Sequence, residues 1–209
     1  MSFNKTAIDW PWKPLYTWNP VVGCKRGCQY CYARRIHNRF NKTPFSHIKF
    51  NPSRLFDKMP KEPARIFVGS MSDFEYWKPE YVQQIFDVCR NNPEHTFMFL
   101  TKESRGYCGY PIPDNVKLGL TLTKCDSKPE FDNLDFHTRN GMKNLFLSIE
   151  PLQGMFLGKI RNNVETVIVG AMTGPGAIEP KPEWIQSIKD HVPEEKIFWK
   201  SNIKNMVGA

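Results

Sequence analysis

The sequence has 209 residues, of which 40% are hydrophobic and 24% charged, and its formal net charge is +8. This composition is typical of a soluble globular chain and excludes a disordered or repetitive one. The longest apolar runs, FMFL and VIVGAM, are far shorter than the ~20 residues of a membrane span, so we expect no membrane partner.

Seven short runs rich in β-branched and aromatic residues predict β-strands. They lie at 17–23, 65–71, 96–102, 116–123, 143–150, 166–172 and 196–200. Helical patterns fall between several of them, at 29–42, 79–92, about 127–140 and 181–192. The second of these helices begins at a proline and carries Tyr81, Ile85 and Val88 at helical spacing.

This alternation predicts the α/β class, with a mainly parallel sheet and helices outside it. We expect one domain over residues 1–209, because this length is within the range of a single compact core. A closed eight-fold barrel typically needs ~250 residues, so the pattern suits a partial barrel of about six units or a doubly wound open sheet. Either architecture places the functional site at the carboxyl ends of the strands.

Polar residues and glycines gather at those predicted strand ends. They are Gly69 to Asp73, Thr101, Lys102, Thr121, Thr123, Ser148, Glu150, Gly170 and residues 173–176. Each one alone is equally well explained as a helix cap or a turn. Their shared position on one rim predicts a ligand site.

Three cysteines, Cys24, Cys28 and Cys31, fall inside eight residues just after the first predicted strand. The amino terminus has no apolar signal core, which predicts a cytoplasmic protein whose thiols stay reduced. Three thiolates on one short loop suit a 4Fe-4S cluster with one iron free of protein ligands, or a zinc site completed by His37. The C-x3-C-x2-C spacing lacks the paired C-x2-C knuckles usual in zinc folds, which favours the cluster. We also expect Lys25 and Arg26 to favour the thiolate form.

The run from Cys24 to Cys31 resembles the C-x3-C-x-aromatic-C motif of the radical S-adenosylmethionine (SAM) superfamily, with Tyr30 as the aromatic residue. The wider segment NPVVGCKRGCQYCYARRIHNRF is similar to the cluster loop of the branch related to spore photoproduct lyase. Together with TWNPVVGC, IFVGSMSD, FLTK, FLSIEPLQG and VIVGAMTGPGA, it resembles a small phage-associated radical SAM family of unassigned chemistry. The resemblance implies a partial (β/α)6 TIM-type barrel with a mainly parallel sheet.

The resemblance also implies a reaction. Cys24, Cys28 and Cys31 would hold a 4Fe-4S cluster that binds the amino and carboxylate groups of SAM. An electron from a donor such as flavodoxin or ferredoxin would cleave SAM to methionine and a 5'-deoxyadenosyl radical, which abstracts hydrogen from the substrate. Tyr30 would shield the cluster and pack on the cofactor.

Further cofactor contacts implied by the resemblance fall on five predicted strand ends. In place of a Gly-Gly-Glu-like sequence, the methionine amino group would meet Gly69, Ser70, Met71, Ser72 and Asp73. The ribose and the methionine carboxylate would meet Thr121, Thr123, Ser148 and Glu150. Adenine would pack against Val169, Gly170, Ala171 and Met172. Lys102 is a further candidate for the carboxylate.

The substrate is predicted to be a nucleotide, a nucleoside or a nucleic-acid base, by analogy with the photoproduct-lyase branch. Arg35, Arg39 and Lys42 share a face of the predicted helix at 29–42 and could contact its phosphates. An ordinary solvated basic surface is the competing explanation. Cys108 or Cys125 could return a hydrogen atom. A non-catalytic zinc or iron-sulfur protein that binds nucleic acid is the alternative function, and it has no reason to bind SAM.

Overall fold

The computed structural model describes residues 3–139 and 141–208. It divides into two compact units. The first comprises Met1–Ile8, Trp12–Thr101 and Gly106–Lys117, and the second comprises Asp9–Pro11, Lys102–Arg105 and Leu118–Ala209. Short 3-10 helices run over Pro52–Phe56, Phe74–Tyr76, Ser104–Tyr107 and Glu194–Lys196. The single domain expected over residues 1–209 stays a prediction.

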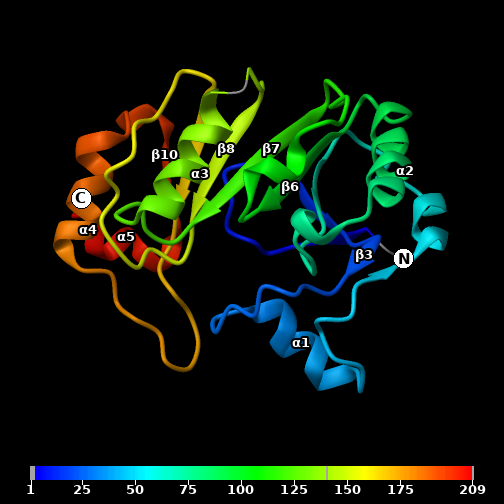
Figure 1. The fold of residues 1–209 in the computed structure, drawn as a ribbon, viewed down its shortest axis with the longest axis horizontal. Helices are drawn as coiled ribbons and strands as arrows, with labels where there is room; N and C mark the ends of the chain where they lie inside the picture. The colour runs from blue at the N-terminus through cyan, green and yellow to red at the C-terminus, as the bar shows by residue number, and fades with distance from the viewer. Residues whose placement is uncertain (1–2, 140, 209) are drawn as a thin grey trace. The chain divides into compact units, whose positions relative to one another are not determined.

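The first unit holds four strands in the order β1-β2-β5-β6, of which Figure 1 labels β6. The edge strand β1 (Asn4–Lys5) runs antiparallel to β2 (Leu15–Trp18), which pairs in parallel with β5 (Arg65–Val68). Strand β5 in turn pairs in parallel with β6 (Thr96–Thr101). A separate two-stranded sheet joins β3 (Val21–Val22) to β4 (Lys49–Phe50). The helices of this unit are α1 (Tyr32–Phe40) and α2 (Pro79–Arg90).

The core of the first unit is rich in aromatic side chains. Trp18, Phe86, Phe97 and Phe99 are fully buried, and Phe74 packs edge-on to Phe99 with 5.8 Å between ring centroids. Helix α2 buries a stripe at helical spacing, namely Val82, Ile85, Phe86 and Cys89. Burial of large apolar side chains is the main stabilising contribution here. It holds the carboxyl ends of β2 and β5; the Gly69–Asp73 segment directly follows β5, and the cysteine loop comes after β2 and the short strand β3.

The second unit holds four parallel strands in the order β7-β8-β9-β10, with β7 included from Leu118 onward. They are β7 (Val116–Leu122), β8 (Leu145–Ile149), β9 (Val164–Val169) and β10 (Ile197–Trp199). All five residues of β8 are buried, as expected for a parallel strand covered on both faces. The helices are α3 (Lys128–Arg139), α4 (Pro182–His191) and α5 (Ser201–Val207).

The α/β class and the parallel pairing are as predicted, and the differences have local causes. The predicted strand at 17–23 is divided into β2 and β3, because Pro20 cannot continue a strand ladder. The predicted helix at 29–42 begins only at Tyr32, since Cys31 caps it. Strands β1 and β4 and helix α5 were not predicted. Residue 140, at the end of a predicted helix, lies outside the described residues.

Every helix in the described ranges is too short or too polar to cross a membrane.

Burial of His137 in α3 predicts a pH-dependent stability. Burial lowers the pKa of its imidazole from 6.5 to about 4, while hydrogen bonds with the backbone of Leu118 and Phe146 act in the opposite sense. Between these values the unfolded state binds a proton that the folded state does not, so the free energy of unfolding falls as pH falls. The full loss is about 3 kcal/mol.

Urea titrations at pH 7.5 and pH 4.5 measure this loss. We expect His137→Gln to lose less stability between the two pH values than the wild type. The exposed His47 provides the control, and His47→Gln should behave as the wild type does. Equal losses in the wild type and His137→Gln would show that His137 does not carry the effect.

Candidate functional site

The loop with the three cysteines is fixed at its base by backbone contacts within the first unit. The Gly23 N–H donates to Met71 O at 2.9 Å, and the Cys24 N–H donates to Phe45 O at 2.8 Å. Gly23 has φ 108°, and a Cβ there would lie 2.3 Å from His47 O. Only glycine therefore fits where the chain leaves β3 and enters the cysteine loop.

The other end of the loop is joined to helix α1. Cys31 is the N-cap residue, and its Sγ accepts a hydrogen bond from the Arg34 N–H at 3.4 Å. The Arg34 guanidinium donates to Cys28 O at 2.6 Å. The helix start thereby orders two of the three predicted ligands, and it directs backbone N–H groups toward a sulfur that carries negative charge as a thiolate.

The three thiols fit an iron-sulfur cluster in chemical type, since cysteine thiolates are its usual protein ligands. All three are free and half-buried. Within the described ranges, however, no three His, Cys, Asp or Glu side chains are grouped as a metal site. Metal ligands must lose their protons, and a metal site is rarely formed before the metal binds.

The pKa of Cys24 is raised from 9.0 to about 11, mainly because burial disfavours the thiolate. The charges of Asp73, Cys28 and Cys31 act in the same direction, and a hydrogen bond from the Arg26 backbone only partly offsets them. The expectation that Lys25 and Arg26 favour the thiolate stays a prediction, since the one contribution of Arg26 to this shift, its backbone hydrogen bond, lowers the pKa. A bound metal centre would have to supply the positive charge that deprotonates it.

His37, the candidate zinc ligand, contacts the segment after α1. It is buried on the inner face of α1, and its Nε2 lies 2.9 Å from Thr43 O. Its ring also packs against Phe45, with 5.2 Å between centroids. These contacts fasten α1 to the segment after it, and His37 forms no metal group with the cysteines among the described side chains.

The Gly69–Asp73 segment follows β5 and is held by Asn19, which follows β2. Asn19 Oδ1 accepts hydrogen bonds from the Met71 N–H at 2.9 Å and from Ser70 Oγ at 3.1 Å. The Tyr32 hydroxyl donates to Ser70 O at 2.7 Å, which connects α1 to the same segment. Asn19 was not among the predicted site residues, although the Asn-Pro pair after a strand marks a turn that could have identified it.

Ser72 and Trp77 fix this segment against the cysteine loop. Ser72 Oγ donates to Gly23 O at 2.6 Å and accepts from Trp77 Nε1 at 2.9 Å. The Trp77 ring lies over Gly69, where a Cβ would be 2.5 Å from the ring. The predicted role of Ser72 in binding the cofactor stays a prediction, but its hydroxyl already has two partners in the protein.

Replacing Ser72 with alanine leaves Gly23 O and Trp77 Nε1 without this partner. We expect the free energy of unfolding to fall by about 1–3 kcal/mol, the cost of unsatisfied buried groups. Chemical denaturation with tryptophan fluorescence measures it. The exposed Ser46 gives a matched control, and Ser46→Ala should change the stability little. An equally small effect of both substitutions would mean that the Ser72 hydroxyl does not fasten the loop.

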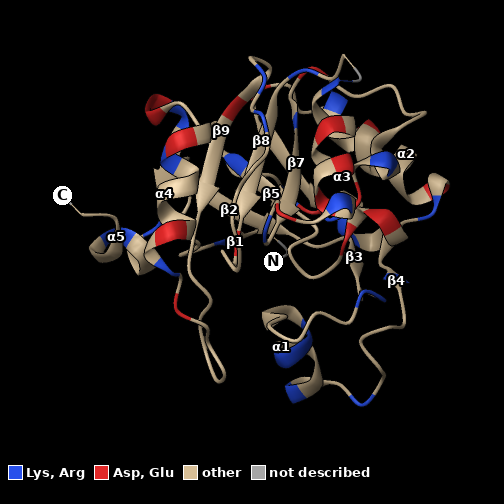
Figure 2. Ribbon diagram, turned by 60° about the vertical axis from the view of Figure 1, so that its left-hand side comes forward, with Lys and Arg blue, Asp and Glu red and all other residues tan. Residues whose placement is uncertain are grey.

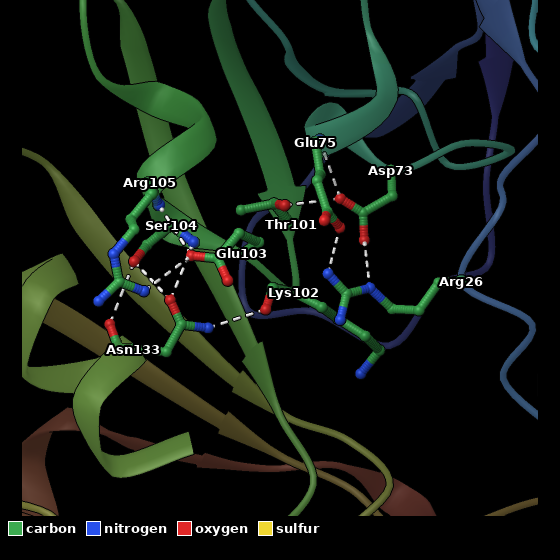
Figure 3. A network of polar contacts seen from close by, with 9 residues as sticks. All are labelled: Arg26, Asp73, Glu75, Thr101, Lys102, Glu103, Ser104, Arg105 and Asn133. Carbon is green, nitrogen blue, oxygen red and sulfur yellow. Dashed lines mark hydrogen bonds and ion pairs between the residues drawn. The ribbon is translucent and has the colours of Figure 1, made fainter. Parts of the chain in front are cut away.

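Asp73 is the buried centre of an acidic group (Figure 3). Its Oδ1 accepts hydrogen bonds from Thr101 Oγ1 at 2.6 Å and from the Glu75 N–H at 3.1 Å. The Arg26 guanidinium donates to the Glu75 carboxylate and lies 3.9 Å from Asp73 Oδ2. Arg26 therefore balances two carboxylates, which leaves less of its charge available to the cysteines.

In the second unit, each of three parallel strands is directly followed by a residue of interest: β8 by Glu150, β9 by Gly170 and β10 by Lys200. The Lys200 ammonium forms an ion pair with the Glu150 carboxylate. Gly170 lies between them, and a Cβ there would be 2.8 Å from Lys200 Cδ and 3.2 Å from Glu150 Oε1. The glycine thus leaves the space through which Lys200 reaches Glu150.

Lys200 was missed, although the rule used for the other strand ends also identifies it.

The predicted adenine contacts, Val169 to Met172, are held mostly by the protein itself. Val169 O accepts from the Lys200 N–H at 2.9 Å. The Ala171 N–H and carbonyl both bond to the side-chain amide of Asn202, at 3.2 and 2.9 Å. Met172 is half-buried, and its sulfur lies 3.5 Å from Gln153 Nε2. Of these residues, the side chain of Met172 is the part best exposed to a planar base.

The other predicted cofactor contacts in this unit also have local partners. Thr123 donates to Glu130 through both its N–H, at 3.2 Å, and its hydroxyl, at 2.7 Å. Thr121 lies opposite the buried Ser148 in the β7–β8 register. Lys102 O accepts from Asn133 Nδ2 at 2.8 Å, and Ser104 bonds to the same asparagine (Figure 3). These contacts order the strand ends around Thr121.

The predicted hydrogen donors differ in exposure. Cys125 is buried, and burial together with the charges of Glu130 and Asp126 raises its thiol pKa to about 12. Cys108 is exposed in the loop after a 3-10 helix. Tyr30 is half-buried, and the predicted substrate residues, Arg35, Arg39 and Lys42, are exposed on α1 or just after it. The roles assigned to these residues stay predictions.

Comparison with known proteins gives a family and a fold. A family model described as protein of unknown function (DUF5131) matches residues 5–202. No match is found among curated proteins.

Two solved structures of spore photoproduct lyase mutants are similar to the chain. One, with bound AdoMet and dinucleoside spore photoproduct, has a TM-score of 0.51 and 14% identity over 71% of this chain and 48% of that one. The other has a TM-score of 0.51 and 13% identity over 93% of this chain and 65% of that one.

The chain thus spans about half to two thirds of the length of these proteins. Their likeness shows the fold, and it confirms the predicted partial TIM-type barrel with a mainly parallel sheet. The predicted phage association stays a prediction.

Proposed function

We propose that this chain, which belongs to the DUF5131 family, is a radical SAM enzyme. One observation carries the proposal. A three-cysteine loop with the spacing of that superfamily lies directly after a strand end, in a chain with the fold of radical SAM proteins. The likeness in fold alone would not suffice, since one fold can host many functions.

We propose that residues of the first unit bind the cluster and the methionine end of SAM. Cys24, Cys28 and Cys31 are the proposed ligands, and the loop base at Gly23 and the cap at Cys31 limit where their sulfurs can lie. In the Gly69–Asp73 segment, the carbonyls of Ser70 and Met71 already accept from Tyr32 and Gly23, so each would take the methionine ammonium as a second donor. Asp73 contributes negative charge, although its carboxylate already accepts from Thr101 and Glu75.

We propose that residues of the second unit bind the nucleoside end of SAM. Glu150 and Thr121 are the polar candidates for the ribose, and Met172 offers an apolar surface to adenine. The contacts of Lys200 with Glu150, and of Asn202 with Ala171, keep this rim rigid before the cofactor arrives. Such preorganisation is the protein's share of catalysis by a cofactor.

When bound, a reduced 4Fe-4S cluster supplies the electron that converts SAM to methionine and a 5'-deoxyadenosyl radical. The protein must then exclude water and present only the intended C–H bond. For the substrate we propose a nucleotide, nucleoside or nucleic-acid base. The net charge of +8 supports an anionic substrate or partner.

The test is SAM cleavage. Protein reconstituted with iron and sulfide under anaerobic conditions and reduced with dithionite should form 5'-deoxyadenosine from SAM. Candidate nucleosides and oligonucleotides are then compared for an increase in that rate. Bound zinc with no 5'-deoxyadenosine would contradict the proposal and favour a non-catalytic nucleic-acid-binding protein.

A further inference from the structure

The positive charge of the chain is concentrated in one segment. Residues 10–56 contain 9 Lys and Arg and no Asp or Glu, whereas the rest of the sequence holds 20 basic and 21 acidic residues. The net charge of +8 therefore arises from this segment alone. It contains the cysteine loop and α1, and Figure 2 shows basic residues on α1, all of them arginines, with no acidic residue.

The exposed side of α1 has two adjacent ridges. One is apolar, at positions four residues apart: Tyr32, Ile36 and Phe40 are 44%, 47% and 74% exposed. The other is basic, formed by Arg35 and Arg39, with Arg39 placed over the Phe40 ring at 5.6 Å. The opposite side of the helix buries Ala33 and His37 against its own unit.

The basic side chains of this surface are available to a partner. Within residues 3–139 and 141–208, the side chains of Arg35, Arg39 and Lys42 form no hydrogen bond or ion pair with the protein. Exposed apolar residues edged by arginine are typical of protein interfaces, in which aromatic residues and arginine dominate the binding energy. Ile36, in the middle of the apolar ridge, has no ring on which a base could stack. These observations favour an acidic protein over a nucleic acid.

We propose that this face of α1, made of Tyr32, Arg35, Ile36, Arg39 and Phe40, is the docking surface for an acidic electron-carrier protein. The inference rests on the proposed function, which requires a supply of single electrons. The proposed ligand Cys31 caps the start of helix α1, so a donor docked on this helix lies within one short helix of the cluster site. In the transfer the donor loses one electron and the oxidised cluster gains it.

The test compares two reductants and measures binding directly. We expect Arg35→Glu/Arg39→Glu to weaken binding of an acidic flavodoxin by roughly ten-fold or more at low salt, measured by calorimetry. Both reactions are run without a substrate, because Arg35 and Arg39 are also the predicted phosphate contacts. Formation of 5'-deoxyadenosine driven by reduced flavodoxin should then fall similarly, while the dithionite-driven cleavage of SAM stays as in the wild type. Ile36→Ser/Phe40→Ser should weaken flavodoxin binding without the same dependence on salt.

The matched control is Lys58→Glu/Lys61→Glu, which makes the same charge change at two exposed lysines outside the basic segment. Flavodoxin affinity equal in the control and in Arg35→Glu/Arg39→Glu would overturn the inference. The inference would also be overturned if Arg35→Glu/Arg39→Glu lost binding to a single-stranded DNA oligonucleotide but still bound flavodoxin as the wild type does. A wild type that forms no 5'-deoxyadenosine with dithionite would contradict the proposed function instead, and calorimetry would still decide the docking surface.

Discussion

Replacing any one of Cys24, Cys28 and Cys31 with alanine should abolish cluster assembly and lower 5'-deoxyadenosine formation more than about 100-fold. That factor exceeds the usual cost of losing a residue that only supports a metal ligand. Each sulfur is a proposed ligand, and two thiolates do not suffice to hold the cluster. Iron and sulfide content after reconstitution, the absorbance of the cluster and the rate of 5'-deoxyadenosine formation measure the effect.

The chain supplies its own control for this experiment. Cys108 is exposed and lies outside the loop, so Cys108→Ala should assemble the cluster as the wild type does. Circular dichroism of each variant separates loss of the cluster from loss of the fold. Full cluster content in Cys28→Ala or Cys31→Ala would contradict the assignment of the three ligands.

The second large effect is expected at Lys200. Lys200→Met keeps the length of the side chain but removes its charge, so the partly buried Glu150 carboxylate loses its partner. We expect the KM for SAM to rise about 10- to 100-fold, because Glu150 is a proposed ribose contact that Lys200 positions. The free energy of unfolding should fall by about 1–3 kcal/mol.

Two further variants separate position from charge. Gly170→Ala keeps both charged groups but places a methyl group 2.8 Å from Lys200 Cδ, so it should also raise the KM. Lys204→Met removes an exposed lysine from α5 and should change neither quantity. If Lys200→Met matched Lys204→Met in both KM and stability, the ion pair would have no part in the site.

Much of the fold can be predicted because each buried parallel strand is a short run of apolar residues. Strands β5 and β6 lie within their predicted runs, and α2 begins at the predicted proline. Helix α5 could not be predicted in the same way. Its seven residues bury only Ile203, so its hydrophobic pattern is weak.

The candidate site was predicted in part, because only some of its residues carry a signal in the nearby sequence. A short motif reveals the cysteines, and strand ends reveal Asp73 and Glu150. Contacts between distant residues stay hidden, such as those of Asn19 with Met71 and of Asn202 with Ala171. The raised pKa of Cys24 stays hidden as well, because burial is its main cause and burial depends on the fold.

The most direct test of the central claim is electron paramagnetic resonance of the anaerobically reconstituted, dithionite-reduced protein, with and without SAM. The claim predicts the signal of a reduced 4Fe-4S cluster, and it predicts that the signal changes when SAM is added, because SAM binds the iron that has no cysteine ligand. A cluster signal that SAM leaves unchanged, or stoichiometric zinc with no cluster, would contradict it.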